Sequence, residues 1–542
     1  MSGWWRWWGF GGSALLAISG LLAGALPSGD PGAGFRTGGF GAVPGSFTIG
    51  LVCWLTGAVA LVIAWLNARD GGLRETLTTG ALWALPLVIA PPLGSRDIYA
   101  YACQGWIWWH GADPYAVGVA EGGCPWAESV PALWWDTPTP YGPLAVILSG
   151  FAASTGSQLA AIIMLRVVAL LSAALLAWQL PRLAVQCGLS PAFACRLGLL
   201  TPLVLIHGIS GAHNDLLLAA LLITALTTAT KILAISGKWS PPTERIAPFP
   251  GNRDDLAQGA QHAVGAQHAV GAREAVGARE AVEVPDVRGA VGTQSETGGA
   301  MNGAVAAAVV AGLLVGLAVG VKVTAIVALP FVLVLAGRRW WATLTAAVAG
   351  FAGLSLATGL GLGWVNALRN TGELAQWSSV PTAIGMAIGY LLRPFGISAD
   401  VPITAARVVG VVTLAIFAVM MLRRAWNHRN DVRAVIVACG LTMAATALLG
   451  PVFYPWYAIA PLAVLAASVK PTADLTASRE ERPGVRRASD INWLLVATVI
   501  CTFLTLPNGL GVPVLTKAVG AFAITIAVIV LAFRMRRPAR AV

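Results

Sequence analysis

The chain has 542 residues, of which 57% are hydrophobic and 11% are charged. Its mean hydropathy of +0.73 excludes a soluble globular protein, because such proteins contain about 25% charged residues. The net charge of +11 would suit nucleic-acid binding, but the basic residues fall at the ends of hydrophobic runs, where they indicate membrane topology. We therefore expect an all-α polytopic membrane protein without a nucleic-acid partner, since helices satisfy their own backbone hydrogen bonds in lipid.

Apolar runs that are long enough to cross the hydrocarbon core recur along the whole chain. They follow a tryptophan-rich start, MSGWWRWWGFGG, which is typical of a membrane-surface aromatic belt rather than of a cleavable signal. We expect about 14 transmembrane helices, within a range of roughly 11 to 14. The expected spans are 12–27, 48–66, 76–93, 157–180, 197–212, 214–235, 304–321, 323–336, 342–362, 404–422, 434–450, 456–469, 490–507 and 514–533. Two interrupted apolar runs, 141–155 and 382–397, are expected to dip into the membrane or lie on its surface.

The distribution of Lys and Arg between alternate loops predicts the orientation of the chain. One set of loops holds most of these residues, including the pairs Arg338–Arg339 and Arg423–Arg424. The opposite set holds Arg36, Arg96, Lys322, Arg369 and Arg393. Since cytoplasmic loops carry the excess of positive charge, we expect a plasma-membrane protein with both termini in the cytoplasm and the loop 94–143 on the periplasmic or extracellular face.

Residues 236–303 differ in composition from the rest of the chain. They contain a six-residue repeat, AQHAVG, AQHAVG, AREAVG, AREAVE, from Ala260 to Glu283. Four short and weakly apolar copies cannot bury a core, so we expect a disordered cytoplasmic linker. It would separate an N-terminal transmembrane half, 1–235, from a C-terminal half, 304–542.

The loop 94–143 carries an unusual share of the acidic residues. Five of the 24 acids of the chain lie in it: Asp97, Asp113, Glu121, Glu128 and Asp136. This concentration predicts that the chemistry takes place in this loop. Cys103 and Cys124 lie there as well, on the side where a disulfide persists, and two unbonded small residues are the equal alternative.

Asp97 stands just outside a hydrophobic run, in Ser95-Arg96-Asp97-Ile98-Tyr99. A carboxylate in this position is suited to accept a proton from an incoming hydroxyl, a contribution of about 10² to 10⁴ in rate. The residues alone favour the alternatives slightly, in which Asp97 pairs with Arg96 or caps the helix that follows.

Three adjacent polar residues, His213, Asn214 and Asp215, occupy a turn between two expected spans. Polar side chains at the edge of lipid need partners, so these residues either bind sugar hydroxyls or cap the next helix. Arg166 and Lys322 are cations within apolar runs, which predicts a cavity, a partner or an anionic ligand such as a lipid phosphate. Snorkelling to the surface is the alternative, and it suits Lys322 better than Arg166.

Aromatic residues crowd the expected outer side, in the stretches 106–141 and 453–457. Such rings stack on sugars, but they also form the belt at a membrane interface. We interpret most of them as belt residues, and expect only those beside carboxylates to bind sugar. The chain contains neither G-x-x-x-x-G-K-[ST] nor H-E-x-x-H, so an activated substrate is expected to arrive through the lipid.

Several motifs, in order, resemble those of the actinobacterial polyprenol-phosphate-mannose-dependent α-1,6-mannosyltransferases, the MptB/MptA family with the GT-C membrane fold. They are SRDIYAYACQG, GADPY, DTPTPYGPL, GAHND, VKVTAIVALPF and YPWY, between Ser95 and Tyr457. The DTPTPYGPL loop favours MptB over MptA. The resemblance implies that polyprenyl-phosphate-mannose is the donor and that a lipid-anchored α-1,6-mannan, the core of lipomannan and lipoarabinomannan, is the acceptor. It implies no metal and no other cofactor.

The resemblance also implies roles for individual residues. Asp97 would be the catalytic base, and Arg96, Lys322 or Arg166 would bind the donor phosphate. The residues expected to bind the sugar or the acceptor are Tyr99, Gln104, Asp113, Tyr115, Asp136, Tyr141, His213, Asn214, Asp215, Tyr454 and Trp456. A transferase for lipid-linked arabinose or glucose remains an alternative. A transporter or glycolipid flippase is a second alternative, which would place paired polar residues near the middle of the membrane.

Overall fold

The structure is a computed structural model, and it describes residues 3–27, 29–68, 71–235, 293–370, 374–469 and 493–536. These residues form helices and no strand, which confirms the all-α prediction. Within these ranges, eight helices are long and apolar enough to cross a membrane, so the chain is a multi-pass membrane protein. The total of 14 spans stays a prediction. The repeat at 260–283, and most of the expected linker, lies outside the described residues.

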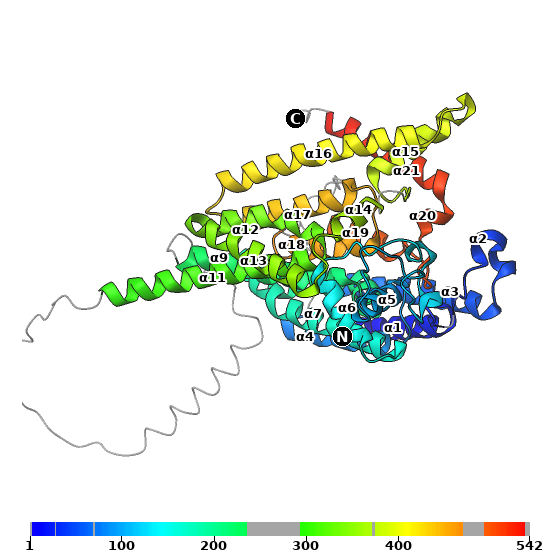
Figure 1. Cartoon of the computed structure of the whole chain (residues 1–542), viewed down its shortest axis with the longest axis horizontal. Helices are drawn as coiled ribbons and strands as arrows, with labels where there is room; N and C mark the ends of the chain where they lie inside the picture. Colours follow the sequence, from blue (N-terminus) through cyan, green and yellow to red (C-terminus); the bar gives the residue numbers. More distant parts are fainter. Residues whose placement is uncertain are drawn as a thin grey trace, which may run out of the picture.

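The first half of the chain forms a layer of packed helices in the lower part of Figure 1. They are α1 (Trp4–Ala23), α2 (Phe35–Gly38), α3 (Gly45–Asn67), α4 (Leu73–Ile89), α5 (Asp97–Trp109), α6 (Pro143–Ala153), α7 (Gln158–Gln186), α8 (Pro191–Gly198) and α9 (Asn214–Ile235). α1 packs closely against α3: a Cβ added to Gly12 would lie only 2.9 Å from the carbonyl oxygen of Gly57. Small residues allow this close approach where lipid supplies little hydrophobic force between helices.

The second half continues the same bundle. Its helices are α11 (Thr293–Val321), α12 (Leu329–Ala336), α13 (Trp340–Thr358), α14 (Trp364–Asn370), α15 (Val380–Leu392), α16 (Asp400–Asn427), α17 (Val432–Leu449), α18 (Ile459–Ala466), α19 (Trp493–Thr502), α20 (Val512–Leu515) and α21 (Lys517–Arg536). α11 packs against both α9 and α13, which joins the two halves. α16 lies at the edge of the bundle in Figure 1, and most of its side chains are exposed, as expected for a helix in lipid.

Three expected spans are broken helices in the structure. The run 197–212 contains the end of α8 and a π-helix, Val204–Ser210; the run 323–336 is a 3₁₀-helix, Val323–Ala328, followed by α12; and the run 456–469 is a 3₁₀-helix, Pro455–Ala458, followed by α18. Prolines at 202, 330 and 455, which lack a backbone N–H, lie at or next to these breaks, and Pro330 and Pro455 stand in the first turn of the segment that follows. Irregular backbone at membrane depth is tolerated where it lines a cavity, and the breaks at 323–328 and 455–458 line one.

The long loop between α5 and α6 folds back onto α5. A disulfide joins Cys103, in α5, to Cys124, in the loop, with 5.4 Å between their Cα atoms, which confirms that pairing. Two short 3₁₀ turns follow, Ala127–Ser129 and Ala132–Trp134. The loop thereby brings Trp134 to the first turn of α5, where Asp97 lies.

Candidate active site

A cavity of about 860 Å³ opens beside the first turn of α5. Its wall combines the start of α5, the loop before α6, the start of α9, Lys322 after α11, and the segments around 450–461 and 508–517. The predicted site residues on this wall are Arg96, Asp97, Tyr141, Asp215, Lys322, Tyr454 and Trp456. The fold therefore gathers motifs that lie hundreds of residues apart in the chain around one cavity.

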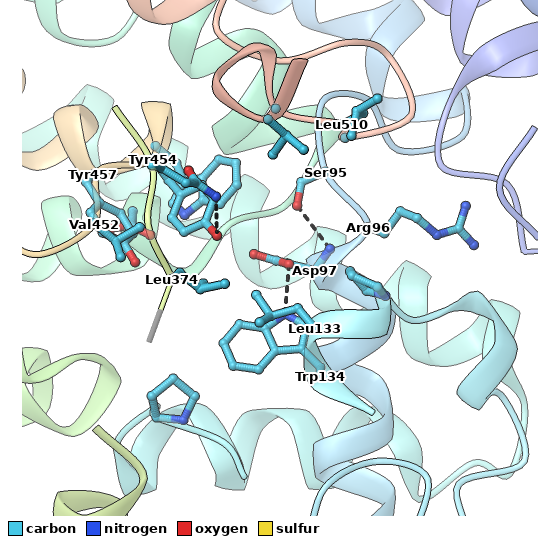
Figure 2. A pocket seen from close by; sticks show the side chains of 18 of the residues that line it. Ser95, Arg96, Asp97, Leu133, Trp134, Leu374, Val452, Tyr454, Tyr457 and Leu510 are labelled. Carbon is cyan, nitrogen blue, oxygen red and sulfur yellow. Dashed lines mark hydrogen bonds between the residues drawn. The ribbon is translucent and has the colours of Figure 1, made fainter. Parts of the chain in front are cut away.

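The carboxylate of Asp97 points into this cavity (Figure 2). Its Oδ1 accepts a hydrogen bond of 3.1 Å from Nε1 of Trp134, and its Oδ2 lies 3.9 Å from Nδ1 of His213. The backbone N–H of Asp97, the first of α5, donates to Oγ of Ser95 at 3.0 Å, so the serine hydroxyl satisfies this N–H group. Asp97 neither caps α5 with its side chain nor forms an ion pair with Arg96 among the described contacts, which answers both alternatives left open by the sequence.

Burial raises the pKa of Asp97 to about 6. The hydrogen bond from Trp134 and the positive charge of Lys322 act in the opposite direction and lower this pKa, because both stabilise the ionised carboxylate. Asp215 adds a smaller increase through charge repulsion. A carboxylate with a pKa near 6 is still mostly ionised at neutral pH and is a stronger base than an exposed aspartate, which suits proton acceptance from a hydroxyl.

Two glycines fix the turn that precedes Asp97. Gly94 adopts a φ of +73°, and a Cβ at this position would come within 2.8 Å of the ring of His207. Gly509, with a φ of +90°, lies against this turn, where a Cβ would come within 2.8 Å of Cα of Ser95. Because only glycine takes these conformations without strain and leaves this room, the C-terminal loop packs directly on the start of α5.

Arg96 and Arg166 are committed to backbone carbonyls. The three guanidinium nitrogens of Arg96 donate to the carbonyl oxygens of Ser129, Gly29 and Leu26 at 2.8, 3.0 and 2.8 Å, and its side chain extends away from Asp97 (Figure 2). Arg166 also donates to two carbonyl oxygens and does not line the cavity. These contacts favour roles in holding segments together over the predicted binding of a phosphate.

Lys322 and Asp215 form a buried ion pair on the cavity wall. Nζ of Lys322 lies 2.9 and 3.1 Å from the two carboxylate oxygens of Asp215, and both residues are less than one-tenth exposed. The same Nζ lies 3.6 Å from the centroid of the Tyr457 ring, a cation–π contact. The GAHND and VKVTA segments therefore meet through their charged residues. Lys322 does not snorkel to the surface.

Trp456 stands between two other rings. It stacks on His213 at 3.8 Å and on Tyr454 at 4.8 Å, with interplanar angles of 16° and 5°. Because both of its faces are covered, Trp456 has no face left for a sugar. Tyr454 occupies the end of this stack and lines the cavity.

Comparisons with known proteins agree with the motifs. Residues 6–338 match the family model for the alpha-(1->6)-mannopyranosyltransferase, N-terminal domain, of the MptA/MptB family. The chain belongs to this family. Residues 381–533 match the MptB C-terminal domain, and residues 296–449 match glycosyltransferase family 87. The protein is thus a multi-pass membrane mannosyltransferase.

Individual relatives of this mannosyltransferase cover most of its length. Alpha-(1->6)-mannopyranosyltransferase Rv1459c of Mycobacterium tuberculosis is 31% identical over 91% of this chain and 81% of its own. Alpha-(1->6)-mannopyranosyltransferase A of the same organism is 28% identical over 84% of this chain and 79% of its own. Alpha-(1->6)-mannopyranosyltransferase B of Corynebacterium glutamicum is 26% identical, over 85% and 72%. No solved structure matches the chain.

Several predicted sugar-binding residues of this mannosyltransferase do not line the cavity. They are Tyr99, Gln104, Asp113, Tyr115, Asp136, His213 and Asn214. Two of them make contacts within the loop between α5 and α6 or between this loop and α5: Oδ1 of Asp113 accepts from the backbone N–H of Tyr115, and Oε1 of Gln104 accepts from the Thr139 hydroxyl. The Tyr99 hydroxyl donates to the carbonyl oxygen of Ala25, after α1. Asp136 is exposed. His213 does not line the cavity itself and lies between Asp97 and Trp456.

Other wall residues were not predicted to form the site. Trp134, one of the aromatic residues that we read mostly as a membrane belt, is buried and hydrogen-bonds to Asp97. Its place in the acid-rich loop, two residues before Asp136, was the available signal. Gln376 and Asn508 line the cavity from segments without any motif, so only the fold reveals them.

Proposed function

We propose that this mannosyltransferase moves mannose from polyprenyl-phosphate-mannose to a lipid-anchored α-1,6-mannan, as in the synthesis of the lipomannan and lipoarabinomannan core. The single observation that supports the proposal best is the Asp97 carboxylate, which points into a cavity that also has apolar walls and a buried ion pair. Such a cavity accommodates a donor with a lipid tail, a charged phosphate and a sugar. The names of the relatives give the sugar and its linkage.

The proposed reaction is a direct displacement with inversion. The acceptor 6-hydroxyl oxygen attacks C1 of the β-linked mannose, and Asp97 takes the hydroxyl proton as the new bond forms. The bond between C1 and the phosphate oxygen breaks on the opposite side, and its electron pair leaves with the polyprenyl phosphate. The product carries an α-1,6 linkage. Lys322, whose charge already lowers the pKa of Asp97, stabilises the negative charge that develops on the phosphate.

We place this reaction on the periplasmic or extracellular face of the plasma membrane, with both termini in the cytoplasm and the two halves 1–235 and 304–542 joined by a cytoplasmic linker. The proposal is supported by the excess of Lys and Arg in the loops on the other side. A donor that diffuses within the membrane reaches such a cavity from the side, whereas the mannan chain of the lipid-anchored acceptor reaches it from the water.

The test supplies the purified protein, in lipid, with labelled polyprenyl-phosphate-mannose and a short α-1,6-mannoside. We expect an elongated product whose new linkage an α-1,6-specific mannosidase removes. Parallel reactions contain polyprenyl-phosphate-linked arabinose or glucose. Transfer of only one of those sugars would replace mannose in the proposal. Movement of labelled glycolipid across sealed vesicles, without any transfer, would favour the transporter.

A further inference from the structure

Two basic side chains on the cavity wall have no hydrogen-bond or ion-pair partner among the described residues. Four basic residues line it: Arg36, Arg96, Lys322 and Lys517. Arg96 is committed to three carbonyls, and the charge of Lys322 is balanced by Asp215. In the described part of the chain, neither Arg36 nor Lys517 makes a side-chain hydrogen bond or an ion pair, and both are exposed.

Arg36 and Lys517 come from opposite ends of the sequence, yet the fold brings their segments together. Arg36 belongs to α2, and Lys517 is the first residue of α21, directly after α20. α2 and α20 lie at the same end of the molecule in Figure 1. Nδ2 of Asn508 donates to Oδ1 of Asp30 at 2.8 Å, which joins the loop before α20 to the loop before α2.

We propose that Arg36 and Lys517 bind the phosphate of a lipid headgroup at the mouth of the cavity. The inference rests on the proposed function in one respect, because it takes the substrates to be lipid-linked. A phosphate needs cations that are not already neutralised, and a guanidinium and an ammonium supply charge-assisted hydrogen bonds. Lys322 shares its charge with Asp215, which accepts from it with both oxygens, so binding of the headgroup phosphate calls for cations in addition to Lys322.

The surroundings of the two cations fit a lipid rather than a soluble anion. Asp30 is the acid nearest in sequence to Arg36 on this wall. Its Oδ1 accepts hydrogen bonds from the side-chain amide of Asn508 and from the backbone N–H of Gly32. Glu128 is exposed, so water and salt screen its repulsion of a bound phosphate.

Apolar side chains continue the wall from this mouth toward α17, and they offer a surface for an acyl or prenyl chain. The members of this apolar surface are Leu218, Met443, Ala447, Leu510 and Val514.

The phosphate has two possible sources, and the experiment separates them. The probes are polyprenyl monophosphate, for the donor, and phosphatidylinositol, for the anchor of the acceptor; each is titrated onto the full-length protein in detergent micelles. The variants are Arg36→Gln, Lys517→Gln and the double variant. Arg393→Gln removes an exposed arginine that does not line the cavity and is the matched control.

We expect the double variant to bind one of the two probes about tenfold more weakly, while the control binds like the wild type. Weaker binding of polyprenyl monophosphate, with a raised KM for the donor, assigns the site to the donor. Weaker binding of phosphatidylinositol, with a raised KM for a lipid-anchored acceptor but not for a soluble mannoside, assigns it to the acceptor. Equal affinity of wild type and double variant for both probes would overturn the inference. A protein that binds either probe through these cations but transfers no mannose would refute the proposed function alone.

Discussion

Nε1 of Trp134 donates a hydrogen bond to Oδ1 of Asp97 at 3.1 Å, and both residues are buried on the same cavity wall. The donor comes from the loop that the Cys103–Cys124 disulfide folds back, and the acceptor is the first residue of α5. Because an N–H aimed at a carboxylate favours its ionised form, Trp134 lowers the pKa of Asp97 against the effect of burial, as the proposed base requires. The loop and α5 therefore both contribute to the proposed catalytic site.

Replacement of Trp134 by phenylalanine removes this N–H and keeps an aromatic ring. Since the hydrogen bond lowers the pKa of Asp97, its loss is expected to raise that pKa by about one unit. The pH–rate profile of mannose transfer would then shift to higher pH by the same amount, with most of the rate recovered at high pH. A variant with a uniformly lower rate and an unshifted profile would show that Trp134 has only a packing role.

The wild-type enzyme should show the titration of Asp97 directly. The base acts in its ionised form and burial raises its pKa to about 6, so kcat/KM should increase tenfold per pH unit below that value. Above about pH 7 the rate should level off. Initial rates of mannose transfer between pH 4.5 and 8.5 measure the profile. A rate that falls as the pH rises through 6 would be inconsistent with a carboxylate base.

The ion pair of Lys322 and Asp215 should respond unevenly to single and double substitutions. Lys322→Met leaves a buried carboxylate without its partner, and Asp215→Asn leaves a buried ammonium, so each is expected to destabilise the fold by roughly 3 to 5 kcal/mol. The double variant should lose less than the sum of the two, because it leaves no unpaired charge. Thermal unfolding in detergent provides the comparison, and strictly additive losses would contradict a tight pair.

The disulfide should stabilise the loop that carries Trp134. Cys103 and Cys124 are 21 residues apart, and a closed loop of this length contributes about 3 kcal/mol in the chain-entropy description. We expect a reductant to lower both the melting temperature and the transfer rate of the wild type. The variant with both cysteines replaced by serine is the control: it should start at the lower values and not respond to the reductant. A reductant that left the wild type unchanged would exclude this role.

The helical, multi-pass character of the chain follows from its hydropathy, but the sequence predicted whole spans at 197–212, 323–336 and 456–469, where the structure has broken helices. Asp97 was identifiable because it opens a polar loop within a recognisable motif. The contact with Trp134 that supports its proposed role was not predictable, since only the fold of the loop brings Trp134 to Asp97. The place of Arg36 and Lys517 on the cavity wall was not predictable for a similar reason. Neither residue belongs to a motif, and only tertiary packing brings the two ends of the chain to one cavity.

Asp97→Asn is the most direct test of the catalytic proposal, because it keeps the size of the side chain and removes its ability to take a proton. Glu121→Gln is the matched control, since Glu121 is an exposed acid of the same loop that does not line the cavity. The measurement is the initial rate of mannose transfer from polyprenyl-phosphate-mannose to a short α-1,6-mannoside at pH 7.5. We predict a loss of about 10² to 10⁴-fold for Asp97→Asn and a wild-type rate for Glu121→Gln. A folded Asp97→Asn protein that transfers mannose at the wild-type rate would contradict the assignment of Asp97 as the base.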